Sequence, residues 1–154
     1  RYAAILEQVI DVDQRVFRGE HPSAIAQVIL EGACRIGTYR GGLLVLQTPP
    51  GPSIAAAVGE PFAGLVGRSA PPDLAATVVR RLPAARMLEV AESLGTVLPA
   101  EQTYLVPLAT ADAYVGCLVL LDPSGETPDD RPMEAYASRA AVAWRHASLH
   151  HGRS

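Results

Sequence analysis

The sequence contains no lysine and no asparagine, and among its 154 residues it has two cysteines, one tryptophan and two phenylalanines. Cys34 and Cys117 form no CxxC pair, which argues against a zinc site or a disulfide framework and for a reducing compartment. No apolar run reaches the roughly 20 residues that a membrane-spanning helix needs. The N-terminal stretch RYAAILEQVIDVDQRVFRGE is interrupted by charges, so no signal peptide is visible. We therefore expect a cytoplasmic protein.

All 13 basic residues are arginines, and 16 acidic residues bring the formal net charge to −3. This balance gives no electrostatic reason to expect binding to nucleic acid or to an anionic membrane. Hydrophobic residues at 49% and charged residues at 19% are typical of one globular domain. The preference for Arg, Ala, Gly and Pro is typical of GC-rich bacterial genomes. Because the chain starts on Arg1, we expect a domain of a longer protein.

Two helices are predicted before the first strand, at residues 2–17 and from Pro22 to about residue 35. Apolar residues of the first helix recur at alternating spacings of three and four, as in a coiled-coil seam. They are Tyr2, Ile5, Val9, Val12 and Val16, and the seam is widened by Leu6, Ile10 and Phe17. Such a stripe fits packing on its own domain or pairing with a second subunit. We predict pairing.

Strands are predicted at residues 42–47 and 53–58, on either side of the segment TPPGP. Its three prolines cannot donate ladder hydrogen bonds, which predicts a rigid exposed connector at residues 48–52. Residues 73–82 are predicted as a short helix, 87–90 as a strand and 95–102 as a loop. The weak periodicity of residues 59–103 is typical of binding loops or lids.

The segment TYLVPLATADAYVGCLVLLD, residues 103–122, has two runs rich in Val, Leu and Tyr around a short polar connector, which is the pattern of a β-hairpin. An alanine-rich helix follows from near Arg131 to at least His150, with Asp129 or Asp130 as its cap and Trp144 as a large anchor. Consecutive strands with short connections predict an antiparallel sheet with helices on one face. The expected fold class is α+β.

Two of these segments, LVPLATADAYVGCLVLLD and EAYASRAAVAW, resemble the terminal hairpin and helix of GAF domains. ACRIGTYRGGLLVL resembles the passage from a helix into the first strand of that family. The resemblance covers residues 22–149, apart from 59–102, which do not align. It implies a GAF-like, PAS-related sheet of about five to six strands, with the terminal helices on one face and a pocket on the other. PAS is the alternative fold, and the long N-terminal helices and the late hairpin favour GAF.

GAF domains commonly act as sensors attached to histidine kinases, phosphatases, cyclases or transcription regulators, and their terminal helices often form a dimeric bundle. The resemblance therefore implies a bacterial signalling domain, as in a two-component system, that binds a small ligand or partner and acts on an output domain outside this chain. We divide the chain into a dimerisation helix (1–19), a core (20–130) and a signalling helix (131–154), and we expect a homodimer through Ile5, Val9, Val12, Val16 and Trp144. A ligand-free dimerisation or spacer domain is the alternative. A thiol-based redox sensor and a small enzyme are further alternatives.

Site chemistry is less constrained by the sequence. No GxSxG, HExxH, Walker or GxGxxG pattern is present, so we expect no catalytic residues. We also expect no metal site, because a pair such as His146 and His150 is more often solvated. Without Lys and Asn the chain cannot match the signature of cyclic-nucleotide-binding members, and it lacks the motifs of bilin- and haem-binding members, so the cofactor is unknown.

The candidate ligand residues are two arginines, whose guanidinium fork matches carboxylate or phosphate, and two tyrosines at strand starts. They are Arg68, Arg86, Tyr104 and Tyr114. The alternative is that the arginines are solvated and the tyrosines only pack.

Overall fold

The computed structural model describes residues 2–37, 39–59, 62–75, 77–82, 89, 92–95, 102–122 and 130–153. Within these ranges the helices and strands follow the order α1 (Tyr2–Phe17), α2 (Pro22–Gly37), β1 (Gly41–Thr48), β2 (Gly51–Val58), β3 (Arg80–Leu82), β4 (Gln102–Ala109), β5 (Tyr114–Asp122) and α4 (Asp130–Arg153). Two 3-10 turns, η1 (Ala63–Leu65) and η2 (Pro72–Leu74), lie between β2 and β3.

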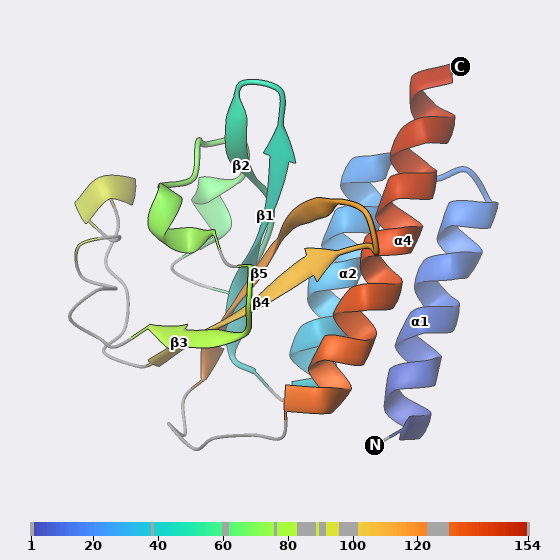
Figure 1. Ribbon diagram of the computed structural model, residues 1–154, viewed down its shortest axis with the longest axis horizontal. Coiled ribbons are helices and arrows are strands. Elements are labelled where there is room, and N and C mark those ends of the chain that lie inside the picture. The colour runs from blue at the N-terminus through green and yellow to red at the C-terminus, as the bar shows by residue number, and fades with distance from the viewer. Residues whose placement is uncertain are drawn as a thin grey trace.

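The strands described form one antiparallel five-stranded sheet in the order β2-β1-β5-β4-β3. Helices α1, α2 and α4 lie on one side of it, and the 3-10 turns η1 and η2 lie on the other (Figure 1). This arrangement confirms the predicted α+β class and the placement of the terminal helices on one face. The terminal hairpin predicted at residues 103–122 is β4 and β5.

Strand β2 begins earlier than predicted, because Gly51 and Pro52 belong to it and pair with Thr48 and Gln47. Thr48 likewise belongs to β1, so the prediction of a connector over residues 48–52 holds only for Pro49 and Pro50. Pro52 is tolerated because β2 is an edge strand, where a missing N–H breaks no ladder. The carbonyl of Pro52 instead accepts a hydrogen bond from the backbone N–H of Ala70 at 3.0 Å.

The helix predicted at residues 73–82 is also wrong. Among the residues described there, only η2 is helical, and residues 80–82 form strand β3, which pairs with β4. The helical spacing of Leu74 and Val78 is misleading, since Leu74 is buried but Val78 is 66% exposed. In β3 the backbone groups of residues 80–82 pair with β4. In an isolated short helix, backbone groups at the helix ends would instead have to hydrogen-bond to solvent. The strand predicted at residues 87–90 and the loop predicted at 95–102 lie almost entirely outside the described residues.

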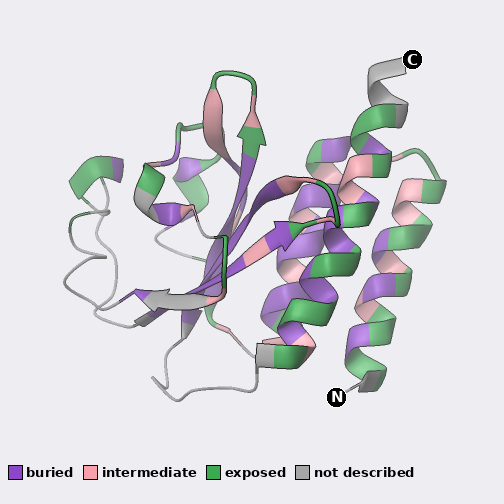
Figure 2. Cartoon of the chain, in the orientation of Figure 1, coloured by how far each residue is buried: buried purple, intermediate pink, exposed green. Residues whose placement is uncertain are grey.

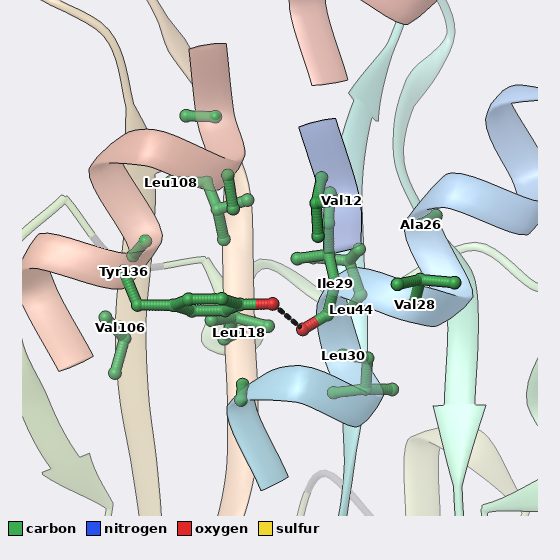
Figure 3. Packing of buried hydrophobic residues seen from close by; sticks show 14 of the residues in the cluster. Val12, Ala26, Val28, Ile29, Leu30, Leu44, Val106, Leu108, Leu118 and Tyr136 are labelled. Atoms are coloured by element: carbon green, nitrogen blue, oxygen red, sulfur yellow. Dashed lines mark hydrogen bonds between the residues drawn. The ribbon is translucent and has the colours of Figure 1, made fainter. Parts of the chain in front are cut away.

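Alternating side chains of the sheet supply two apolar layers. The central strands are accordingly coloured as buried along most of their length (Figure 2). The layer toward the helices, which we call the helix-side cluster, includes Leu44, Leu46, Val106, Leu108, Leu118 and Leu120 from the strands. Figure 3 shows part of this layer around Tyr136 of α4, whose hydroxyl donates a hydrogen bond to the Ile29 carbonyl of α2. The layer on the other face, the loop-side cluster, includes Leu43, Val45, Leu105, Cys117, Val119 and Leu121.

Candidate functional site

The loop-side face of the sheet is where the pocket was predicted. Side chains from the segments beyond the sheet pack directly onto it. These are Phe62, Leu65, Leu74 and Leu94, each at most 4% exposed. Within the part of the chain that the structure describes, this face is therefore covered by an apolar layer of the protein's own side chains.

Arg68 holds two of these covering segments together. Its guanidinium Nη1 donates to the carbonyl of Leu94 at 2.5 Å. Its backbone carbonyl accepts from the N–H of Ile54, so the same residue also fixes the segment to β2. The side chain is otherwise exposed. Arg68 thus has a structural role, while Arg86, the second predicted arginine, lies outside the described residues.

The two predicted tyrosines lie in different surroundings. Tyr104 is 1% exposed and belongs to the helix-side cluster, where its ring stacks on that of Tyr39 with centroids 6.1 Å apart. Tyr114 is half-buried at the start of β5, opposite Ala109. Arg68 lies in the segment whose Leu65 packs on the other face. The structure therefore does not bring Tyr104 and Arg68 together.

One polar residue of the sheet interior was not predicted. Thr103 is 0% exposed, and its Oγ1 has no hydrogen-bond partner among the residues described. It lies next to Leu82 of β3 and Leu121 of β5 in the ladder. Leaving a buried hydroxyl unpaired costs about 1–3 kcal/mol. Threonine is common in β-strands, so nothing in the sequence distinguishes Thr103 from other strand residues.

The seam predicted for dimerisation lies largely inside the subunit. Ile5, Val9 and Val12 are 7%, 9% and 2% exposed and belong to the helix-side cluster, against which Val16 and Trp144 also pack. These side chains hold α1 on its own domain. The neighbouring row on α1 remains exposed instead: Leu6 at 58%, Ile10 at 52% and Phe17 at 93%. Successive residues of an α-helix are rotated by about 100° around its axis. The two rows are one residue apart in the sequence, so they point in different directions.

A groove of about 690 Å³ separates α1 from α4 next to this exposed row. Asp13, Val16 and Phe17 line it on the side of α1, and Arg139, Val142 and His146 line it on the side of α4. Val142 is 46% exposed, and Leu149, further along α4, is 56% exposed. The face made by α1 and α4 therefore combines exposed apolar side chains with charges of both signs.

No family model matches the sequence, and no curated protein matches it. Solved structures do match. The GAF domain of a protein named as a sensor histidine kinase from Pseudomonas syringae pv. tomato is 24% identical, with a TM-score of 0.65 over 98% of this chain and 92% of that one. The phycoerythrobilin-bound GAF domain of a cyanobacterial phytochrome is 14% identical, with a TM-score of 0.72 over 96% and 97% of the two chains. The second GAF domain of DevS from Mycobacterium smegmatis is 22% identical, with a TM-score of 0.63 over 86% and 99%.

The chain has the GAF fold. The likeness covers at least 92% of each compared GAF domain and, for the first two, at least 96% of this chain. The predicted resemblance is thereby confirmed at the level of the fold. Because these identities are all below 25%, the compared structures establish the fold of this chain but not its ligand or its partners. Those have to be argued from the residues of this chain.

The remaining candidate chemistry is limited. Cys34 is 8% exposed, and burial, followed by the nearby Glu31 carboxylate, raises the pKa of its thiol to about 11. Cys117 is 0% exposed. Because the thiolate is the reactive form, neither environment favours redox chemistry.

The part of the chain that is described holds no cluster of three or more His, Cys, Asp or Glu suited to a metal ion. Among the described helices, none has the length and apolarity to cross a bilayer.

Proposed function

We propose that this GAF fold is a non-catalytic sensory or regulatory domain. It forms a homodimer through its terminal helices and passes a signal to an output domain outside this chain, such as a histidine kinase, phosphatase or transcription regulator. The solved neighbours support a sensory role, since they are named as domains of a sensor histidine kinase, a phytochrome and a methyl-accepting chemotaxis protein. We further propose that the protein is bacterial and cytoplasmic.

The arrangement of α1 and α4 carries this proposal. The two helices lie side by side and run in the same direction, so that the N- and C-terminal ends of the chain are at opposite ends of the helix layer (Figure 1). The order of the lining residues agrees: Val9 and Val12 face Tyr136, whereas Val16 and Phe17 face Val142 and His146. A displacement that enters at α1 therefore has a continuous path to the end of α4.

The sheet is connected to α4 by both apolar and polar contacts. Tyr136 is buried among strand side chains of the helix-side cluster. Near the other end of α4, Arg145 donates from Nη1 to Asp112 Oδ1 at 2.9 Å and to Thr110 Oγ1 at 3.1 Å. Thr110 and Asp112 belong to the connection between β4 and β5. A change in the sheet that shifts this hairpin would therefore move α4, as the proposed relay requires.

The ligand would bind on the loop-side face, and its identity is unknown. We retain Arg68, Arg86 and Tyr114 as candidate contacts for a small anionic molecule. Tyr104 is a weaker choice, because its ring is buried against Tyr39 on the helix side. Thr103 adds a buried hydroxyl that could hydrogen-bond to a ligand on this face.

A ligand-free dimerisation or spacer domain is the second candidate. The observation that favours it is the packing of Phe62, Leu74 and Leu94 onto the loop-side face, where a ligand would have to displace them. Burial of each such side chain is worth about 1.5–3 kcal/mol, so a ligand would have to compensate for exposing them.

Native mass spectrometry of the purified chain distinguishes these functions. A dimer that carries additional mass supports the sensor and gives the ligand's size. A dimer without additional mass favours the spacer, and a bare monomer at high protein concentration contradicts the relay. If a mass is found, Arg68→Gln should reduce its occupancy, whereas Arg40→Gln, a substitution of another exposed arginine, should not.

A further inference from the structure

Helix α1 carries a second heptad row beside its buried one. Ala3, Leu6, Ile10, Asp13 and Phe17 recur at alternating spacings of three and four, and all five are exposed. Scattered exposed apolar residues are normal on a protein surface. A row that keeps the coiled-coil spacing over the whole helix is different, because that spacing places its members along one line that another helix can contact.

Asp13 interrupts this row with a carboxylate at the point where the groove toward α4 begins. Across the groove, α4 offers Arg139 and, two turns later, His146. Asp13 and Arg139 also line a smaller gap together with Val9 and Tyr136. Among the residues described, neither Asp13 nor Arg139 has an ion-pair partner. This surface therefore exposes a carboxylate and a guanidinium that form no ion pair within the described part of the subunit.

We infer that a second copy of this chain covers this surface, that Phe17 of each copy enters the α1–α4 groove of the other, and that Asp13 pairs with Arg139 of the partner subunit. The inference rests on the proposed homodimer and specifies its contacts. Phe17 is its main anchor: it is 93% exposed, whereas the only other phenylalanine of the sequence, Phe62, is 0% exposed. Large aromatic side chains that become buried dominate the energy of many interfaces.

Charge favours a second copy as the occupant. A two-fold axis places a surface against itself, so a surface of one sign would repel its copy. Among the residues that line the groove, each copy offers one carboxylate, that of Asp13, and one guanidinium, that of Arg139, and a two-fold axis forms the Asp13–Arg139 pair twice.

The direction of the helices fixes the orientation of the two copies. Because α1 and α4 run the same way, residues that line one groove lie at the same level along the helices. An axis parallel to the helices then keeps Asp13 level with Arg139 of the partner subunit, and Phe17 level with the groove near Val142. The same axis brings both α4 C-termini to one end, which the proposed relay needs.

The test uses two opposite charge reversals in the whole 154-residue chain. Asp13→Arg leaves two positive charges at this point of each subunit, and Arg139→Asp leaves two negative charges. Both positions are exposed, so circular dichroism should show an unchanged fold. By sedimentation velocity over a concentration series, each variant alone should dimerise at least about tenfold more weakly than the wild type. An equimolar mixture of the two should recover dimers, and native mass spectrometry should identify them as heterodimers.

The mixture separates pairing between subunits from pairing within one, since each variant subunit contains only like charges at these positions. A wild-type dimer that neither reversal weakens would overturn this inference and leave the proposed homodimer standing. A mixture that stays monomeric, after both single variants have lost the dimer, would also overturn this inference and leave the proposed homodimer standing. A wild-type monomer at all concentrations would instead overturn the homodimer itself.

Phe17→Ala gives an independent check. It should weaken the wild-type dimer at least about tenfold, whereas Val78→Ala, at a 66% exposed apolar position between η2 and β3, should not. Equal dimer affinities of Phe17→Ala and the wild type would overturn the role of Phe17 as anchor.

Discussion

The hydroxyl of Tyr136 on α4 donates a 2.8 Å hydrogen bond to the backbone carbonyl of Ile29 on α2 (Figure 3). Tyr136 is 0% exposed, and burial raises the pKa of its phenol, so the hydroxyl keeps its proton. The close approach depends on Gly32, since a Cβ at this position would lie 2.4 Å from the Tyr136 oxygen. One glycine therefore determines how closely α2 and α4 pack.

We predict that Gly32→Ala destabilises the protein even though alanine is the better helix former. The intrinsic gain of alanine over glycine in a helix is about 1 kcal/mol. Overpacking a buried contact typically costs about 1–3 kcal/mol, and the Tyr136 ring is enclosed by the core. We therefore expect a net loss in the free energy of unfolding, measured by urea denaturation.

The companion variant Tyr136→Phe removes the oxygen that the new methyl group would meet. By itself it should cost about 1 kcal/mol for the lost hydrogen bond. In that background, Gly32→Ala should cost less than in the wild type, which a double-mutant cycle would report as coupling. Gly64→Ala, where no atom lies within 4 Å of the new Cβ, is the control for the glycine substitution. Equal costs of Gly32→Ala in both backgrounds would show that the contact with the oxygen does not matter.

The second prediction concerns Asp112 in the connection between β4 and β5. The hydrogen bond from the Thr110 hydroxyl, and then the charge of Arg145, lower the pKa of the Asp112 carboxyl. A lowered folded-state pKa means that the contribution to stability is present above the unfolded pKa, near 3.9, and is lost as the pH falls through the folded value. Titration of the carboxyl carbon by NMR should give a value below 3.9. Thr110→Val should raise it most, and Arg145→Gln should raise it less.

The third prediction concerns the reactivity of Cys34. Since burial raises the pKa of this thiol to about 11, the folded protein keeps it protonated at pH 8. In a Cys117→Ala background, labelling by a disulfide reagent should be slow at pH 8 and rise about tenfold per pH unit up to pH 10. In urea, the thiol should titrate near its ordinary pKa of about 8.5 and react rapidly. Rapid labelling of the folded protein at pH 8 would revive the redox-sensor alternative.

The sequence predicted the elements whose hydrophobic pattern is long and regular, such as α1 and the β4–β5 hairpin. It could not predict which of two adjacent heptad rows on α1 would face the core. Val9 and Ile10 are both aliphatic, and only the position of α2 and α4 decides that Val9 is buried and Ile10 exposed. The same limit explains residues 73–82, where the spacing of Leu74 and Val78 fitted a helix but an open edge of β4 was available for Arg80–Leu82. Contacts between segments distant in sequence, such as Arg68 with Leu94, leave no local pattern to detect.

The last prediction uses the two phenylalanines of the sequence as a matched pair. Phe62 is 0% exposed in the loop-side cluster, and Phe17 is 93% exposed on α1. Phe62→Ala removes a buried ring and leaves a cavity between the sheet and its covering segments, which should lower the free energy of unfolding by about 3–5 kcal/mol. At a protein concentration low enough to keep subunits apart, Phe17→Ala should change it by less than about 0.5 kcal/mol. A small cost for Phe62→Ala would mean that the covering layer opens readily. That result would favour the sensor over the spacer, because a ligand could then displace the layer at little cost.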